Sequence, residues 1–117
     1  MPSYTNYEPS KMLRLLFTER DKYGGKPLYE AIVDKCRDLH IAGATVFRGI
    51  EGFGSTGEIH HSHLVGHDSP IVVTIVDTPE NVERLLPAIE EMMDKGTIAA
   101  SEVMAIRVRK PARSQSV

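Results

Sequence analysis

The stretch "PIVVTIVDTPENVERLLPAIEEMM", residues 70–93, contains one strand and one helix joined by a tight turn. Its first seven residues are nearly all apolar and rich in β-branched side chains, which favours a central strand over residues 70–76. Thr78 is a favourable N-cap residue, and Pro79 suits the first turn of the helix that follows. Apolar residues then recur at helical spacing, and we expect Gly96 to end the helix.

Outside this segment, the apolar pattern predicts a second helix and further strands. Alternation indicates a strand over residues 11–18, and a three- and four-residue repeat indicates a helix over residues 27–40. β-type composition returns over residues 44–54, which form a hairpin with residues 58–66, and alternation returns over residues 102–109. The order is strand, helix, strand, hairpin insert, strand, helix, strand. This order predicts an α+β fold of the split β-α-β type, with two helices on one face of an antiparallel sheet.

The length of 117 residues leaves room for one compact domain. We place the domain at residues 11–109, between a polar lead-in at residues 1–10 and a flexible tail at residues 110–117. The two helices cover only one face of the predicted sheet, and the other face must be buried by something else. In a chain this small, a second copy of the same chain is the simplest way to bury it, so we expect an oligomer.

The composition argues against several classes of function. Fourteen Lys and Arg against sixteen Asp and Glu give a formal charge of -2, so we do not expect nucleic-acid binding. No run approaches the roughly 18 apolar residues of a membrane span, and the N-terminus lacks the apolar core of a secretory signal. We therefore expect a cytoplasmic protein. No nucleophile has a recognisable adjacent base, so we do not expect an enzyme.

Several motifs, in the right order, resemble those of the nitrogen regulatory PII signalling proteins. The stretch "GATVFRGIEGFG" (43–54) is similar to the second PII strand, which runs into the mobile T-loop, and "IRVR" (106–109) is similar to the basic end of the last PII strand. The stretch "DKYGGKPLYEAIV" (21–33) resembles instead the PII-like family of unknown function, with its motifs "YxGKPLYEAIV" and "GATVxRGIEGFG". The resemblance covers nearly the whole domain, and the chain is identified as a member of this PII-like family.

This resemblance implies a ferredoxin-like βαββαβ sandwich that assembles as a homotrimer. It also implies that an effector, usually an adenine nucleotide such as ATP, ADP or AMP, binds in the clefts between subunits and that no cofactor is required. The loop of residues 53–69 would change shape in response and act on a partner protein, such as a membrane transporter or an enzyme. Carried over by position, the residues on one side of the cleft are Thr45, Gly52, Phe53 and Gly54, and those on the other side are Arg107 and Arg109.

The residue types at these positions suit an anionic ligand. Glycines let backbone amides approach an anion closely, and two arginines at i and i+2 of a strand project from the same face as a phosphate clamp. The alternative is a solvated basic edge that discourages strand addition. The glycine-rich, lysine-bearing phosphate loop of PII proteins has no counterpart in "DKGTIAASE" (94–102), so the resemblance does not extend to that loop.

The histidines of the hairpin support a second class of function. In an extended strand, His61 and His63 share one face and His60 lies on the other. A His-x-His pair supplies two ligands to zinc or copper, and a third must come from His67, Asp68 or another subunit. The alternative function is therefore a trimeric divalent-metal-binding protein that resembles the cation-tolerance proteins, with His60, His61 and His63 as candidate ligands. The remaining interpretation is an exposed hairpin that tolerates its histidines.

Overall fold

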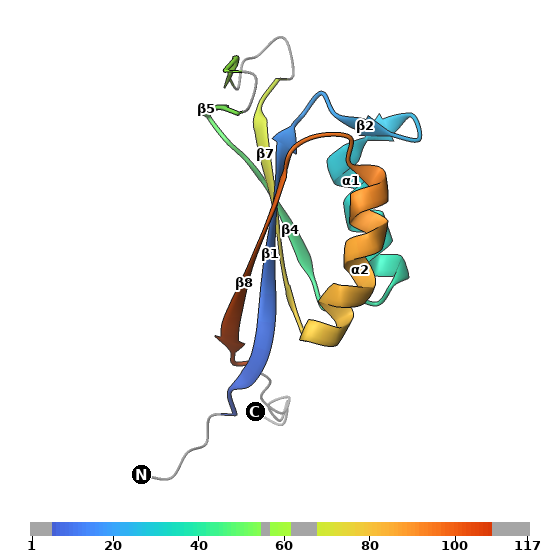
Figure 1. Cartoon of the computed structure of the whole chain (residues 1–117), viewed down its shortest axis with the longest axis vertical. Coiled ribbons are helices and arrows are strands. Elements are labelled where there is room, and N and C mark those ends of the chain that lie inside the picture. Colours follow the sequence, from blue (N-terminus) through green and yellow to red (C-terminus); the bar gives the residue numbers. More distant parts are fainter. Residues whose placement is uncertain (1–5, 55–56, 62–67, 109–117) are drawn as a thin grey trace, which may run out of the picture.

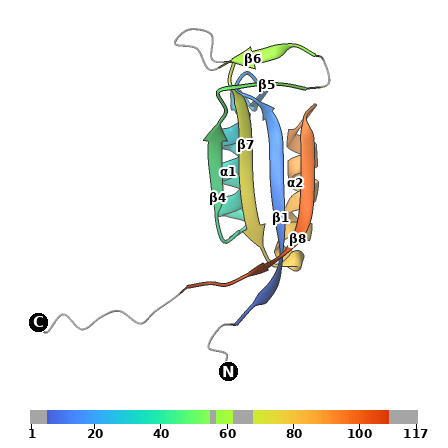
Figure 2. The same cartoon turned by 90° about the vertical axis from the view of Figure 1, so that its left-hand side faces the viewer.

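The computed structural model describes residues 6–54, 57–61 and 68–108. Four antiparallel strands form one sheet in the order β4 (Ala44–Arg48), β7 (Pro70–Asp77), β1 (Glu8–Thr18) and β8 (Thr97–Ala105). Two helices, α1 (Leu28–Asp38) and α2 (Pro79–Met92), lie side by side on one face of this sheet (Figure 1; Figure 2). The predicted α+β fold, a ferredoxin-like βαββαβ sandwich, is confirmed.

Two small hairpins extend this framework. Strands β2 (Lys22–Tyr23) and β3 (Lys26–Pro27) pair just before α1, and strands β5 (Glu51–Phe53) and β6 (Ile59–His61) form the expected insert between β4 and β7. The β5–β6 hairpin lies beyond the end of the sheet at which β7 begins (Figure 2). Most of the predicted return arm after His61 falls outside the described residues, as does the predicted tail at residues 110–117.

The hydrophobic core fills the space between the sheet and the two helices. Its buried members are Leu13, Leu15, Phe17, Leu28, Ala31, Ile32, Cys36, Ile71, Val73, Ile75, Val82, Leu85, Ile89 and Met92. Burying a side chain of this kind stabilises the fold by roughly 1.5–3 kcal/mol. Burial also raises the pKa of the Cys36 thiol to about 11, so the thiol stays protonated and serves in packing, as expected.

The turn between β7 and α2 has the capping that its sequence predicts. The Oγ1 atom of Thr78 accepts a hydrogen bond from the backbone N–H of Asn81 at 3.2 Å, and Pro79 is the first residue of the helix. The helix ends at Met92, where the chain becomes extended, and so it does not continue to Gly96 as expected. Of the helices in the described ranges, neither is long and apolar enough to cross a bilayer.

The last strand begins and ends earlier than its sequence pattern predicts. Alternation favours residues 102–109, but β8 ends at Ala105 because that residue pairs with Glu8, the first residue of β1. The alternation continues beyond this point without a partner strand. Arg107 therefore lies past the end of the strand, and Arg109 lies outside the described residues. The expected strand thus does not include Arg107, and a shared face for Arg107 and Arg109 remains a prediction.

The other face of the sheet has no helix over it in the described part of the chain (Figure 2). Because side chains alternate along strands, this face is formed by the positions between the core residues. On β1, β4 and β7 they are Met12, Arg14, Leu16, Thr45, Phe47, Val72, Thr74 and Val76. Phe47 is 55% exposed and Leu16 is 39% exposed. A second copy of the chain as the cover of this face remains a prediction.

Candidate functional site

A shallow depression of about 290 Å³ lies where β7 ends. The residues that line it are Ala42, Gly43, Ala44, Thr45, Thr74, Val76 and Arg107. Thr45 and Thr74 are cross-strand partners on the face that the helices leave uncovered. The structure thus brings together two of the residues predicted from the sequence, Thr45 and Arg107.

Arg107 lies between two carboxylates. Its Nε atom is 3.5 Å from Oε2 of Glu8, and its Nη2 atom is 3.7 Å from Oδ1 of Asp77. The Arg107 side chain is still 44% exposed, so its guanidinium is accessible to a ligand in the depression. Glu8 is the more exposed of the two carboxylates and hence the easier one for an anionic ligand to displace.

Asp77 anchors this end of the sheet. Its carboxylate accepts hydrogen bonds from the backbone N–H of Ala42 at 2.8 Å, the backbone N–H of Thr78 at 2.6 Å and the Asn81 side chain at 3.2 Å. Burial by itself raises the pKa of Asp77, but these hydrogen bonds and the nearby Arg107 outweigh it, and the pKa is lowered. Asp77 therefore stays ionised and holds the segment before β4 against the start of α2.

The three remaining described residues of the predicted cleft lie at the opposite end of the sheet. Gly52 approaches Pro70, where an added Cβ atom would come within 3.3 Å of the proline ring, and Phe53 is 74% exposed. Thr45 pairs with Thr74, four residues further along β7, which corresponds to about 13 Å. Within one chain, Thr45 thus lies with Arg107 and apart from Gly52, Phe53 and Gly54, which differs from the grouping expected from the sequence.

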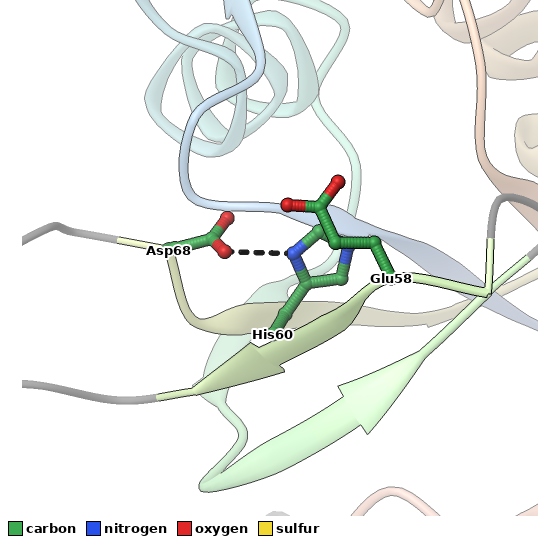
Figure 3. A group of neighbouring side chains, drawn as sticks. All are labelled: Glu58, His60 and Asp68. Atoms are coloured by element: carbon green, nitrogen blue, oxygen red, sulfur yellow. Dashed lines mark hydrogen bonds and ion pairs between the residues drawn. The ribbon is translucent and has the colours of Figure 1, made fainter.

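A second cluster of polar side chains joins the β5–β6 hairpin to the start of β7 (Figure 3). Glu58, His60 and Asp68 each offer a ligand atom, and these atoms all lie within 4.8 Å of one another. The Nδ1 atom of His60 is 2.9 Å from Oδ2 of Asp68. The i, i+2 spacing of Glu58 and His60 was a usable sequence signal, but only the fold reveals how close Asp68 lies.

Of the alternative metal ligands named from the sequence, the two described histidines have different partners. His61 lies next to His60 in β6, but its Nδ1 atom is 3.3 Å from Oε1 of Glu51 on β5. His63 lies outside the described residues. Of the two described histidines, His60 belongs to the cluster and His61 does not, and the neighbours of His60 there are carboxylates.

Comparison with known proteins places the chain in a family. The family model described as DUF190, uncharacterized ACR, COG1993, matches residues 10–105. This chain belongs to the DUF190 family. A UPF0166 protein of Aquifex aeolicus (strain VF5) is 37% identical over 100 residues, which is 82% of this chain and 92% of that relative. The family predicted from the sequence motifs is confirmed.

Solved structures share the fold of this DUF190 protein. CPII from Thiomonas intermedia K12, bound to ADP and bicarbonate, superposes with a TM-score of 0.68 at 20% identity, over 87% of this chain and 93% of CPII. A second CPII structure, described as a nitrogen regulatory PII-like protein bound to ADP, AMP and bicarbonate, gives a TM-score of 0.65 at 22% identity, with 87% and 92% covered. The divalent ion tolerance protein CutA1 from Ehrlichia chaffeensis gives 0.56 at 16% identity, with 92% and 88% covered. These similarities show a PII-like fold.

Proposed function

We propose that this DUF190 protein is a cytoplasmic PII-like regulatory protein that binds an adenine nucleotide, or a similar anionic effector, between the subunits of a homotrimer. Its output is a conformational signal from residues 53–69 to a partner protein, such as a transporter or an enzyme, without chemistry on the nucleotide. No cofactor is needed for this role.

The observation that carries the proposal is that the predicted cleft residues form two groups at opposite ends of the sheet within one chain. Thr45 and Arg107 line one depression on the uncovered sheet face, whereas Gly52, Phe53 and Gly54 lie at the far end of the sheet. A ligand can contact both groups only where the depression of one chain meets the hairpin end of another. The uncovered face, with Leu16 and Phe47 exposed, is suited to bring copies together.

The chemistry of the depression suits a nucleotide with few phosphates. Arg107 supplies a planar donor fork for a phosphate, and the Thr45 and Thr74 hydroxyls can donate to a phosphate, ribose or base. The stretch that follows Gly96 lies in β8, paired with β1. β8 is an edge strand, so about half of its backbone amides are committed to β1, and no lysine follows Gly96 in this stretch, which favours AMP or ADP over a triphosphate. The ADP and AMP of the CPII structures agree with this preference.

A thermal-unfolding panel on metal-free protein with ATP, ADP, AMP and cyclic AMP tests the proposal. A ligand at one hundred times its dissociation constant stabilises the folded state by about 2.7 kcal/mol, which raises the midpoint visibly. We expect Arg107→Ala and Thr45→Val to abolish the shift. Arg37→Ala, which removes the same charge from the exposed side of α1, should leave the shift unchanged.

Two further measurements, nucleotide binding by a Glu8 variant and the mass of the assembly in solution, distinguish an intersubunit site at Arg107 from unspecific anion binding. Glu8→Gln removes the carboxylate that competes for Arg107, so we expect it to strengthen nucleotide binding. Sedimentation should show a mass of three chains. A monomer that binds nucleotide with undiminished affinity, or equal shifts in the Arg107 and Arg37 variants, would contradict the proposal.

The alternative of a trimeric divalent-metal-binding protein has a specific observation in its favour, the Glu58, His60 and Asp68 cluster. The similarity to CutA1 concerns the fold alone. Metal binding at this cluster is compatible with nucleotide binding, because the cluster and the depression lie at opposite ends of β7.

A further inference from the structure

The geometry points to a divalent transition-metal site formed by Glu58, His60 and Asp68, which fastens the β5–β6 hairpin to the start of β7. Glu58 and His60 come from the hairpin and Asp68 from the segment before β7, so a bound ion would join two parts of the chain (Figure 3). This inference does not depend on the proposed nucleotide site.

The distances fit a common coordination sphere. Bonds of about 2.1 Å from one ion to a nitrogen and an oxygen place these two atoms about 3.0–3.4 Å apart in octahedral or tetrahedral geometry. The Nδ1 atom of His60 and Oδ2 of Asp68 are 2.9 Å apart, and the full set lies within 4.8 Å. Small side-chain adjustments therefore suffice.

The surroundings of Asp68 favour a cation. Its Oδ1 atom is buried and accepts no hydrogen bond from any residue in the described ranges, although Nε of Arg20 lies 3.4 Å away. A buried carboxylate oxygen without a hydrogen bond is costly, and a metal ion bound by both oxygens of Asp68 would compensate for it. Arg20 on one side of the carboxylate leaves Oδ2 directed at His60, an outer contact of the kind that orients metal ligands.

The donor set indicates the class of ion. Two carboxylates balance the charge of a divalent cation, and one imidazole nitrogen favours zinc and its first-row neighbours over magnesium and calcium. Three protein ligands leave at least one coordination position for water or for a group from another molecule. The alternative is the hydrogen bond between His60 and Asp68 with no metal, and metal titration distinguishes the two states.

The test is calorimetric titration of untagged, metal-free protein with Zn²⁺, and with Mg²⁺ as the comparison ion. We expect one Zn²⁺ per chain and much weaker binding of Mg²⁺. His60→Gln and Asp68→Asn should each weaken Zn²⁺ binding by about tenfold or more. Glu58→Gln, a change at an exposed position, should also weaken Zn²⁺ binding.

The matched control is the double variant His61→Gln with His63→Gln, which removes the His-x-His pair and leaves the cluster complete. We expect this variant to keep its affinity for Zn²⁺ within about twofold. Hydrogen exchange supplies a second readout, because Zn²⁺ should slow exchange of the amides in β5 and β6 and leave β1 unchanged.

Three results would overturn the inference: no Zn²⁺ binding by the wild-type protein, binding that survives Asp68→Asn, or binding that is lost in the His61 and His63 double variant. Each is distinguishable from failure of the proposed function, since nucleotide binding is measured without metal and depends on Arg107.

Discussion

Strand β7 has an aspartate near each end, and the two differ in what surrounds them. Asp77, the last residue of the strand, has a side chain that is 3% exposed and accepts hydrogen bonds from two backbone amides and one side-chain amide. Asp68, two residues before the strand, has a side chain that is 14% exposed and faces His60 and Arg20. Asp77 thus has rigid backbone partners, whereas Asp68 contacts the side chains of Arg20 and His60.

This difference separates a structural carboxylate from one that can respond to a ligand. Backbone amides cannot move away without unfolding, so Asp77 is permanently satisfied and unsuited to bind an ion. Side-chain partners such as His60 and Arg20 can rotate, so Asp68 can exchange one partner for a metal. The predictions below test this contrast between the two ends of β7, beginning with the largest expected effect.

Gly96→Ala tests whether the backbone at the hairpin end of the sheet can adjust to an added side chain, as the side chains around Asp68 can. Gly96 has φ +114°, and an added Cβ atom would lie 2.4 Å from the carbonyl oxygen of Leu16, a backbone atom that cannot turn aside. We expect the free energy of unfolding to fall by about 3 kcal/mol or more, measured by denaturant unfolding. Gly43→Ala is the control, because its added Cβ atom would meet nothing within 4 Å. Equal effects of the two variants would contradict this assignment.

Asp77→Asn should have the next largest effect. The amide retains one acceptor oxygen but turns an NH₂ group towards an N–H donor, so at least one hydrogen bond from Ala42 or Thr78 is lost in a buried place. We expect a loss of about 2 kcal/mol in the free energy of unfolding. A loss below about 0.5 kcal/mol would show that Asp77 is not the anchor of this end of the sheet.

The same carboxylate gives a pH dependence with a defined sign. The pKa of Asp77 is lowered in the folded protein, so its contribution is present above the unfolded-state pKa of about 3.9 and is lost as the pH falls through the lower folded-state pKa. We expect the stability gap between wild type and Asp77→Asn to be constant near neutral pH and to narrow below about pH 4. Denaturant unfolding at several pH values measures the gap, and a gap that widens on acidification would reverse the argument.

Asp68→Asn should have the smallest effect on stability and a large effect on metal binding. Its contacts are an ion pair with Arg20, which is 63% exposed, and a hydrogen bond with His60. We expect a change of less than about 1 kcal/mol in metal-free protein. If Asp68→Asn destabilises the fold as much as Asp77→Asn does, the contrast between the two ends of β7 is wrong.

Much of the fold could be predicted from local patterns. The alternation of Leu13, Leu15 and Phe17 and the helical repeat that includes Ile32 and Cys36 assign residues to the core correctly, because periods of 2.0 and 3.6 follow from backbone geometry alone. The end of β8 could not be predicted in this way. The alternation continues through residue 108, but the strand ends at Ala105, which pairs with Glu8, the first residue of β1.

The candidate sites were less predictable than the fold. Thr45 and Arg107 were named from family resemblance, but their shared depression within one chain was not expected. The spacing of Glu58 and His60 in the sequence indicated two members of the His60 cluster, but it did not indicate Asp68. His60 pairs with Asp68 and His61 with Glu51, which the sequence did not predict. A side chain's chemistry depends on neighbours from other segments, which no local period encodes.

The sequence by itself determined the order of the elements, the faces that strands and helices bury and the capped turn at Thr78, because each follows from contacts between residues close in the chain. Only the tertiary structure decided that Arg107 lies beside Asp77 and that Asp68 lies between His60 and Arg20. Those contacts join residues that are distant in sequence. Their formation requires the whole sheet to set its register and twist, and the free energy that holds them comes mainly from the core.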